Sequence, residues 1–183
     1  MLKEYAKLED SRLEMLRAVP HITNPSDKQV AEYAMSHGYK ELVRSVAPGT
    51  YYNKSYSEGT ETITEEWTPW ELDTAKSDAL DRLQMKLDNA LSTRVTIECI
   101  GFEDGIIYDQ NALTNAMGLE PGDVFIDAKD GLHELTEENI VEIKKSLKSH
   151  RLGLYAATTE KRAVVAAAET VDEVEATLKA YLA

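Results

Sequence analysis

The sequence predicts an α+β fold: a small N-terminal β-rich module, a connecting helix, and a C-terminal module with a short β-hairpin, a long helix and a final helix. The first half has short runs of Tyr, Thr and Ile separated by polar turns, a pattern typical of β-hairpins. The second half ends in a helical pattern near 30 residues long. We expect the boundaries at residues 1–68, 69–92 and 93–183.

The N-terminal module is expected to contain two hairpins and one helix. Leu2 to Leu8 and Arg12 to Leu16 flank a polar turn and are interpreted as strands, although their Leu, Glu and Lys content also suits a helix. Asn24 and Pro25 resemble a helix start, and Gly38 resembles its end. A strand over residues 39–46 and a hairpin over residues 50–68 follow.

The connecting helix is predicted from its start signal. Thr68, Pro69 and Glu71 combine a capping box with proline at the first helical position. Leucines and alanines then form an apolar face down to Leu91. With the boundary near residues 91–93, a fragment of residues 93–183 is expected to fold alone.

The C-terminal module is expected to begin with a strand from Arg94 to Phe102. Asp104-Gly105 matches a two-residue hairpin turn, after which residues 106–108 return. A short helix over residues 110–117, ended by Gly118, and a strand over residues 124–126 complete the part before the long helix.

The long helix is predicted to begin at Thr136, whose hydroxyl can cap the first turn. Leu135 and Ile140 occupy the positions of a hydrophobic staple. Gly153 weakens the helix by about 1 kcal/mol relative to Ala and marks a point for a bend. A capping box at Thr170 to Glu173 starts the last helix.

An apolar stripe runs along the long helix in steps of three and four. Its members are Ile140, Ile143, Leu147, His150, Leu154, Ala157, Lys161, Val164 and Ala168. The stripe either closes an intramolecular core or pairs with other copies of the chain as a homo-oligomer. For the second outcome, the candidate interface residues are Ile140, Ile143, Leu147, His150 and Leu154.

Composition restricts the class of partner. The 183 residues carry a formal net charge of −13, which repels phosphate backbones, so we expect no nucleic acid partner. No apolar run approaches the length of a membrane span. Cys99, the single cysteine, lies in an alternating strand pattern and is interpreted as a buried small hydrophobe.

No motif predicts catalysis or a cofactor. A calcium loop beginning at Asp127 would place Glu138 at its twelfth position, but Lys129 and Gly131 occupy positions that need oxygen ligands. The segment is therefore interpreted as a polar turn before a helix. The histidines lack metal-ligand spacing, and no phosphate loop or nucleophile elbow occurs. We expect a protein that is not an enzyme and needs no metal or cofactor.

An aromatic cluster is the clearest surface candidate in the first half. Tyr51, Tyr56, Trp67 and Trp70 are of the type enriched at interfaces and on sugar-stacking surfaces. The alternative is that aromatic residues here, Trp67 and Tyr52 above all, form the core of a small sheet, which needs large side chains to bury enough area.

The C-terminal half resembles an uncharacterised module common in bacteriophage tail proteins. The matching residues are Asp127, Asp130, Gly131, Leu135, Thr136, His150, Ala166 to Ala168 and Thr170 to Val174. Phe125 stands where such modules often have Trp. In the first half, ITNPSDKQVAEYAMSHGYKELV and YYNKSYSEGTETITEEW resemble N-terminal parts of phage tail or tail-fibre accessory proteins.

This resemblance implies a non-enzymatic bacteriophage tail component, either a structural part of the tail or fibre or an assembly factor. Its partners would be other phage tail or fibre proteins, and it would be found in the virion or in the host cytoplasm during assembly. The alternative function is a carbohydrate-binding module that uses the aromatic cluster.

Overall fold

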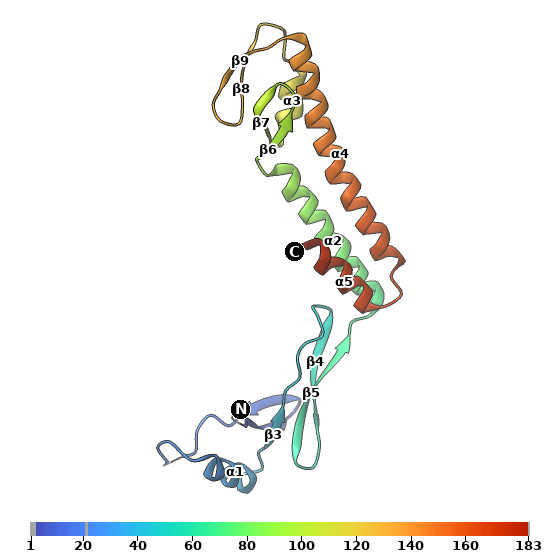
Figure 1. Ribbon diagram of the computed structural model, residues 1–183. Coiled ribbons are helices and arrows are strands. Elements are labelled where there is room, and N and C mark those ends of the chain that lie inside the picture. The colour runs from blue at the N-terminus through green and yellow to red at the C-terminus, as the bar shows by residue number, and fades with distance from the viewer. Residues whose placement is uncertain (1–2, 21, 183) are drawn as a thin grey trace. The chain divides into compact units, whose positions relative to one another are not determined.

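The computed structural model describes residues 3–20 and 22–182 and confirms the α+β prediction. The chain divides into two compact units, Met1–Leu72 and Asp73–Ala183 (Figure 1). This division falls earlier than the expected boundary near residues 91–93, because the helix expected to connect two modules belongs to the second unit. The two units are described separately.

The first unit is built on one five-stranded sheet in the order β2-β1-β3-β5-β4. Its strands are β1 (Tyr5–Glu9), β2 (Arg12–Met15), β3 (Lys40–Val43), β4 (Tyr52–Glu58) and β5 (Thr62–Pro69). All neighbouring pairs are antiparallel except β3 and β5, which are parallel. Ala6, Leu42 and Ile63 form the buried centre of one face of this sheet.

The N-terminal hairpin prediction is confirmed over the described residues, which leave out Leu2. Asp10 and Ser11 both have positive φ, 48° and 64°, as the mirror-image hairpin turn requires. The polar residues at this turn therefore favour the hairpin over a helix for the N-terminal segment.

Helix α1 (Asp27–Ser36) is present, but its cap is Ser26 rather than the expected Asn24. The Ser26 hydroxyl accepts the Gln29 amide at 3.4 Å, and the Gln29 side chain accepts the Ser26 amide at 3.0 Å. Asn24 instead adopts a φ of 52° in the preceding loop. The reciprocal serine–glutamine pair satisfies two amide donors, which the Asn–Pro start cannot do.

The expected helix start at Thr68-Pro69 is wrong. Pro69 ends β5 and pairs with Tyr52, and helix α2 (Leu72–Ser92) begins three residues later. Proline lacks an amide donor. Strand β3 pairs only with residues 62–64 of β5, so β5 is paired on one side only at Pro69, and proline is tolerated there as well as in the first turn of a helix.

The second unit contains α2, two small hairpins and three further helices. The hairpins are β6 (Val95–Cys99) with β7 (Phe102–Tyr108) and β8 (Val124–Ile126) with β9 (Leu132–Glu134). The helices are α3 (Ala112–Met117), α4 (Glu137–Ala167) and α5 (Val171–Leu182). Strand β9 was not predicted, because its three residues alternate Leu, His and Glu and give too short a pattern.

The turn expected at Asp104-Gly105 lies instead at Ile100-Gly101. Ile97 pairs with Ile106 and Cys99 with Phe102, so one residue of β6 faces three residues of β7, and β7 bulges. Gly105 sits in this bulge with a φ of 75°, and a Cβ there would lie 2.6 Å from the Ile97 carbonyl oxygen. The glycine therefore serves a bulge rather than a turn.

Helix α4 begins at the predicted cap and packs on different neighbours along its length. Thr136 and Asn139 form the capping box, and α4 continues through Gly153 without a break. Its N-terminal half covers a core made with α3, β6 and β7, which includes Phe102, Ile106 and Ile143. Cys99 belongs to the same core, as predicted, and burial raises the pKa of its thiol.

The C-terminal half of α4 lies beside α2 and α5 (Figure 1). Thr158 and Val165 are buried here, whereas the predicted Ala157 and Val164 are exposed. A straight α-helix repeats every 3.6 residues, so a stripe read with a period of 3.5 turns by about 20° per heptad. The buried side therefore shifts by one residue after Leu154.

Gly153→Ala is expected to raise the free energy of unfolding by about 0.5–1 kcal/mol, because glycine inside a helix loses more backbone entropy on folding. Among the described residues, nothing lies within 4 Å of a Cβ built at this position. Urea denaturation measures the change, and Ala156→Gly on the exposed side of the same helix is the matched reverse control. An unchanged or reduced stability of Gly153→Ala would contradict the expectation.

Candidate binding surfaces

The aromatic candidates of the first unit do not form one open surface. Tyr51 is fully buried, which corrects its assignment as a surface residue, and its ring lies 5.4 Å from that of Trp70 in an edge-to-face arrangement. Tyr56, Trp67 and Trp70 are half-buried. Tyr56 packs against the core centred on Ile63. Aromatic side chains are used here mainly to fill a small sheet.

A buried carboxylate lies among these aromatic residues. The Glu65 side chain is 3% exposed, and its Oε2 lies 3.1 Å from Lys54 Nζ and 3.8 Å from an Arg44 nitrogen. Lys54 Nζ in turn lies over the rings of Trp67 and Tyr56, 5.0 and 6.0 Å from their centroids. Lysine thus occupies the ring faces that a sugar would need, which favours a structural role for this cluster.

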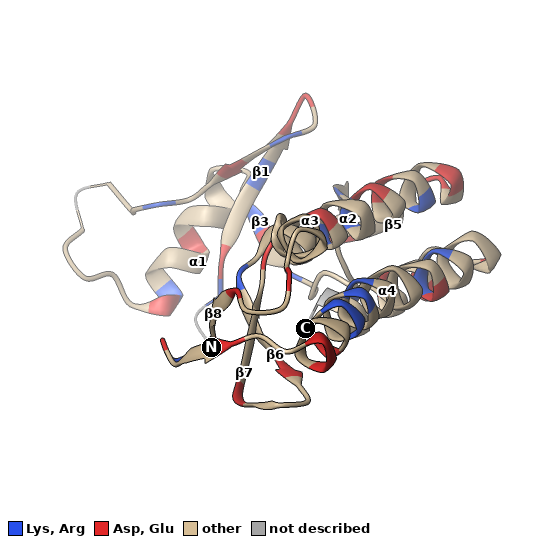
Figure 2. Cartoon of the chain, turned by 90° about the horizontal axis from the view of Figure 1, so that it is seen from above, with Lys and Arg blue, Asp and Glu red and all other residues tan. Residues whose placement is uncertain are grey.

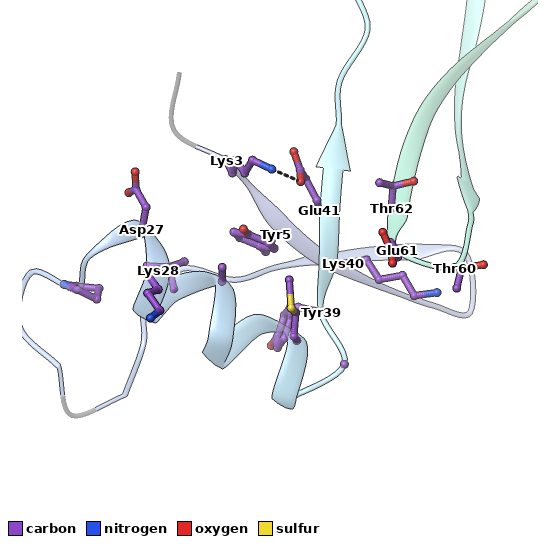
Figure 3. Close-up of a pocket in the computed structure, with 15 residues that line it drawn as sticks. Lys3, Tyr5, Asp27, Lys28, Tyr39, Lys40, Glu41, Thr60, Glu61 and Thr62 are labelled. Atoms are coloured by element: carbon purple, nitrogen blue, oxygen red, sulfur yellow. Dashed lines mark hydrogen bonds and ion pairs between the residues drawn. The ribbon is translucent and has the colours of Figure 1, made fainter.

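A groove of about 1000 Å³ lies between α1 and the sheet (Figure 3). Its apolar lining comes from Tyr5 and from α1, where Met35 is largely exposed. Three lysines and three acidic residues also line it, and Lys3 Nζ pairs with Glu41 Oε2 at 2.6 Å. Its lining charges balance, so the groove has no preference for ligands of either sign.

The interface candidates of α4 divide into two groups. Ile140, Ile143 and Leu147 are buried in the core of the second unit, so they contact the same chain rather than a second copy. His150 and Leu154 are half-buried, and the His150 ring lies 4.6 Å from that of Tyr108. The first half of the stripe therefore closes an intramolecular core, which was one of the two expected outcomes.

Strands β8 and β9 form an apolar surface that sequence reasoning missed. Val124, Ile126 and Leu132 are 65%, 55% and 72% exposed. Ile126 and Leu132 are direct cross-strand partners, and Val124 shares their face two residues away. We call these three residues the hairpin face. The sequence feature that could have indicated this surface is the unbroken apolar run Val124-Phe125-Ile126. A strand with apolar residues on both faces is typical of a strand that is covered on both faces.

The inner side of the same hairpin is fixed to the core. Phe125 and His133 are cross-strand partners, and their rings lie 5.4 and 5.0 Å from the Phe102 ring in edge-to-face contacts. Phe102 is itself buried. The hairpin face is thus presented on a supported element rather than on a free loop.

Asp127 shapes the loop between β8 and β9. Its Oδ1 accepts the amides of Lys129 and Gly131, both at 2.8 Å, and its Oδ2 lies 2.7 Å from His133 Nε2. A Cβ at Gly131 would lie 2.4 Å from Oδ2, so a larger residue there would displace the Asp127 carboxylate. Asp127 therefore closes a turn, as interpreted from the sequence, with His133 as the partner that was not foreseen.

The contact with His133, followed by the amides of Gly131 and Lys129, lowers the pKa of Asp127. A carboxyl whose folded pKa lies below its unfolded value of about 3.9 stabilises the fold fully above that pH. This stabilisation is lost as the pH falls through the lower, folded pKa. We expect Asp127→Asn to be less stable at pH 6 and to lose less stability on acidification.

Urea denaturation between about pH 6 and pH 2 checks this expectation. Glu103→Gln removes an exposed carboxylate of β7 and should leave the acid dependence close to that of the unaltered chain. Equal acid dependence in the unaltered chain and Asp127→Asn would show that the carboxylate does not stabilise the folded state.

In comparisons with known proteins, no protein-family model, no curated protein and no solved structure matched the chain. Within residues 3–20 and 22–182, no helix is both long enough and apolar enough to span a membrane. The same residues contain no group of three or more His, Cys, Asp or Glu side chains placed to hold a metal ion.

Proposed function

We propose that the chain is a non-enzymatic component of a bacteriophage tail or tail fibre that acts through protein–protein contacts. The observation that carries the proposal is the hairpin face. Three large aliphatic side chains exposed together on a supported hairpin lose unfavourable contact with water when a partner covers them. The resemblance of the C-terminal half to phage tail modules supports the choice of partner class.

The surroundings of the hairpin face indicate the chemistry of the partner surface. Exposed acidic residues flank it along the hairpin: Asp123 precedes β8, Asp130 lies in the turn and Glu134 ends β9. The whole segment, residues 118–142, contains eight Asp or Glu, of which Asp127 is buried, and one Lys. That lysine, Lys129, is paired with Asp104 at 2.6 Å. An aliphatic patch with an acidic rim fits a partner surface that is aliphatic with a basic rim.

Protein composition of purified phage particles tests the proposed function. We expect the chain in particles if it is a structural part of the tail or fibre. If it is an assembly factor, we expect it in infected cells bound to a tail or fibre protein. Ile126→Asp with Leu132→Asp should abolish either association, whereas Val43→Asp, at an exposed apolar position of β3, should not. Neither incorporation nor binding by the unaltered chain would refute the proposal.

The carbohydrate-binding alternative has less structural support, since Lys54 lies over the two ring faces and Tyr51 is buried. A glycan screen tests it directly. Binding that Trp67→Ala abolishes would favour the carbohydrate function over protein contacts.

A further inference from the structure

A second exposed surface with the opposite charge lies on α4. Its members are Lys145, Lys148, Leu152 and Tyr155, which we call the α4 outer face. All four are exposed, Leu152 by 56% and Tyr155 by 38%. At 100° per residue they lie about 120° round the helix from the buried positions. The core that covers the other side of α4 therefore leaves them open.

Charge is segregated between the two surfaces. Residues 143–159 contain four Lys or Arg and no Asp or Glu, whereas residues 118–142 contain eight Asp or Glu and one Lys. Lys145 Nζ lies 3.1 Å from Glu142 Oε1, so this lysine already has one acidic neighbour in its own chain, whereas Lys148 is exposed. Both segments belong to the second unit, and their charges can be followed in Figure 2. In Figure 1, β8 and β9 lie on the other flank of β6 and β7 from α4, so the two faces do not compete for one partner surface.

We propose that the hairpin face of one copy of this chain docks on the α4 outer face of a second copy. The inference rests on the proposed function, because it takes the hairpin face as the contact surface and names the partner. Val124, Ile126 and Leu132 would cover Leu152 and Tyr155, while the acidic rim faces Lys145 and Lys148. Opposite charges around a small apolar centre set the orientation and exclude like-charged surfaces.

The two faces differ and lie on opposite flanks of β6 and β7, so one partner cannot cover both at once and the contact is heterologous. Each copy offers one face to the next copy and the other face to the previous one, which produces a ring or an open chain rather than a closed two-fold dimer. The net charge of −13 makes copies repel at long range, so association requires physiological salt to screen that repulsion.

Complementation between two variants of the full chain tests the proposal. The first variant, Ile126→Asp with Leu132→Asp, loses the hairpin face, and the second, Lys145→Glu with Lys148→Glu, loses the α4 outer face. All four positions are exposed, so both variants should fold, which circular dichroism melts verify. Lys28→Glu with Lys179→Glu makes the same charge change as the second variant at exposed positions elsewhere.

Sedimentation velocity is measured at physiological salt from about 1 µM to about 1 mM. We expect the unaltered chain and the control variant to form species larger than dimers, and each disabled variant to stay monomeric. An equimolar mixture of the two disabled variants should stop at a dimer, because only one working pair of faces remains.

Two results would overturn the inference: an unaltered chain that stays monomeric throughout, or a mixture that stays monomeric while the unaltered chain associates. Failure of this self-association can be distinguished from failure of the proposed function. If Ile126→Asp with Leu132→Asp still abolishes incorporation into particles, the hairpin face binds a different tail protein. If that variant leaves incorporation unchanged, the hairpin face is not the surface that joins the chain to the tail. The proposed function itself fails only if the unaltered chain is neither incorporated nor bound to a tail or fibre protein.

Discussion

A fragment of residues 93–183 should lose the folded state of α5 and of the C-terminal half of α4, whereas a fragment of residues 73–183 should keep both. The physical reason is α2, which the shorter fragment lacks. Ala75, Ala79, Leu83 and Leu87 form its buried side. Burying Leu83 and Leu87 alone contributes about 1.5–3 kcal/mol each, a large part of the stability of a small domain.

Polar contacts join the same three helices. Lys76 Nζ donates to the Ala166 carbonyl oxygen at 2.9 Å, and an Arg162 nitrogen donates to Gln84 Oε1 at 2.9 Å. Lys86 donates to the Tyr181 carbonyl oxygen and lies over the Tyr181 ring. Removing α2 therefore takes away both the apolar cover and the donors that satisfy α4 and α5 near their ends.

Hydrogen exchange followed by mass spectrometry checks this expectation. Amides of residues 155–182 should exchange rapidly in the shorter fragment and be protected in the longer one. Amides of the core around Phe102 should be protected in both fragments, and they serve as the internal control. Protection of the α5 amides in the shorter fragment would contradict this expectation and would support a domain boundary near residues 91–93.

Short sequence patterns predicted most helices and strands, because the residues that begin or end each of them lie within a few positions of one another. The polar turn at Asp10 and Ser11 and the cap at Thr136 were found in this way. The errors arose where one residue type serves two purposes. Pro69 suits a strand end as well as a helix start, and Gly105 suits a bulge as well as a turn. Only pairing with a distant strand decides between such alternatives.

The surfaces were harder to predict than the elements. Periodicity identified Ile140, Ile143 and Leu147 as an apolar stripe, but it does not say whether the same chain or another chain covers it. The hairpin face depends on β9, whose partner β8 is fixed by the turn at Asp127. A surface made of two three-residue strands becomes visible only when that turn brings them together.

Phe102→Ala is expected to lower the free energy of unfolding of the second unit by about 3–5 kcal/mol, the usual loss for a buried phenylalanine. Phe102 is 4% exposed, and its ring contacts the rings of Phe125 and His133 on the core side of the hairpin. The substitution removes both edge-to-face contacts, so β8 and β9 should separate from the core before the rest of the unit unfolds. The hairpin face would then lose its fixed position.

Urea denaturation gives the total loss, and hydrogen exchange locates it. Amides of β8 and β9 should lose more protection than those at the centre of α4. Phe125→Ala is the matched control, because Phe125 is only half-buried and should cost less. If the proposed contacts are right, Phe102→Ala should weaken binding through the hairpin face although Phe102 never touches the partner. A loss of stability below about 1 kcal/mol, or one spread evenly over the second unit, would mean that Phe102 does not hold the hairpin in place.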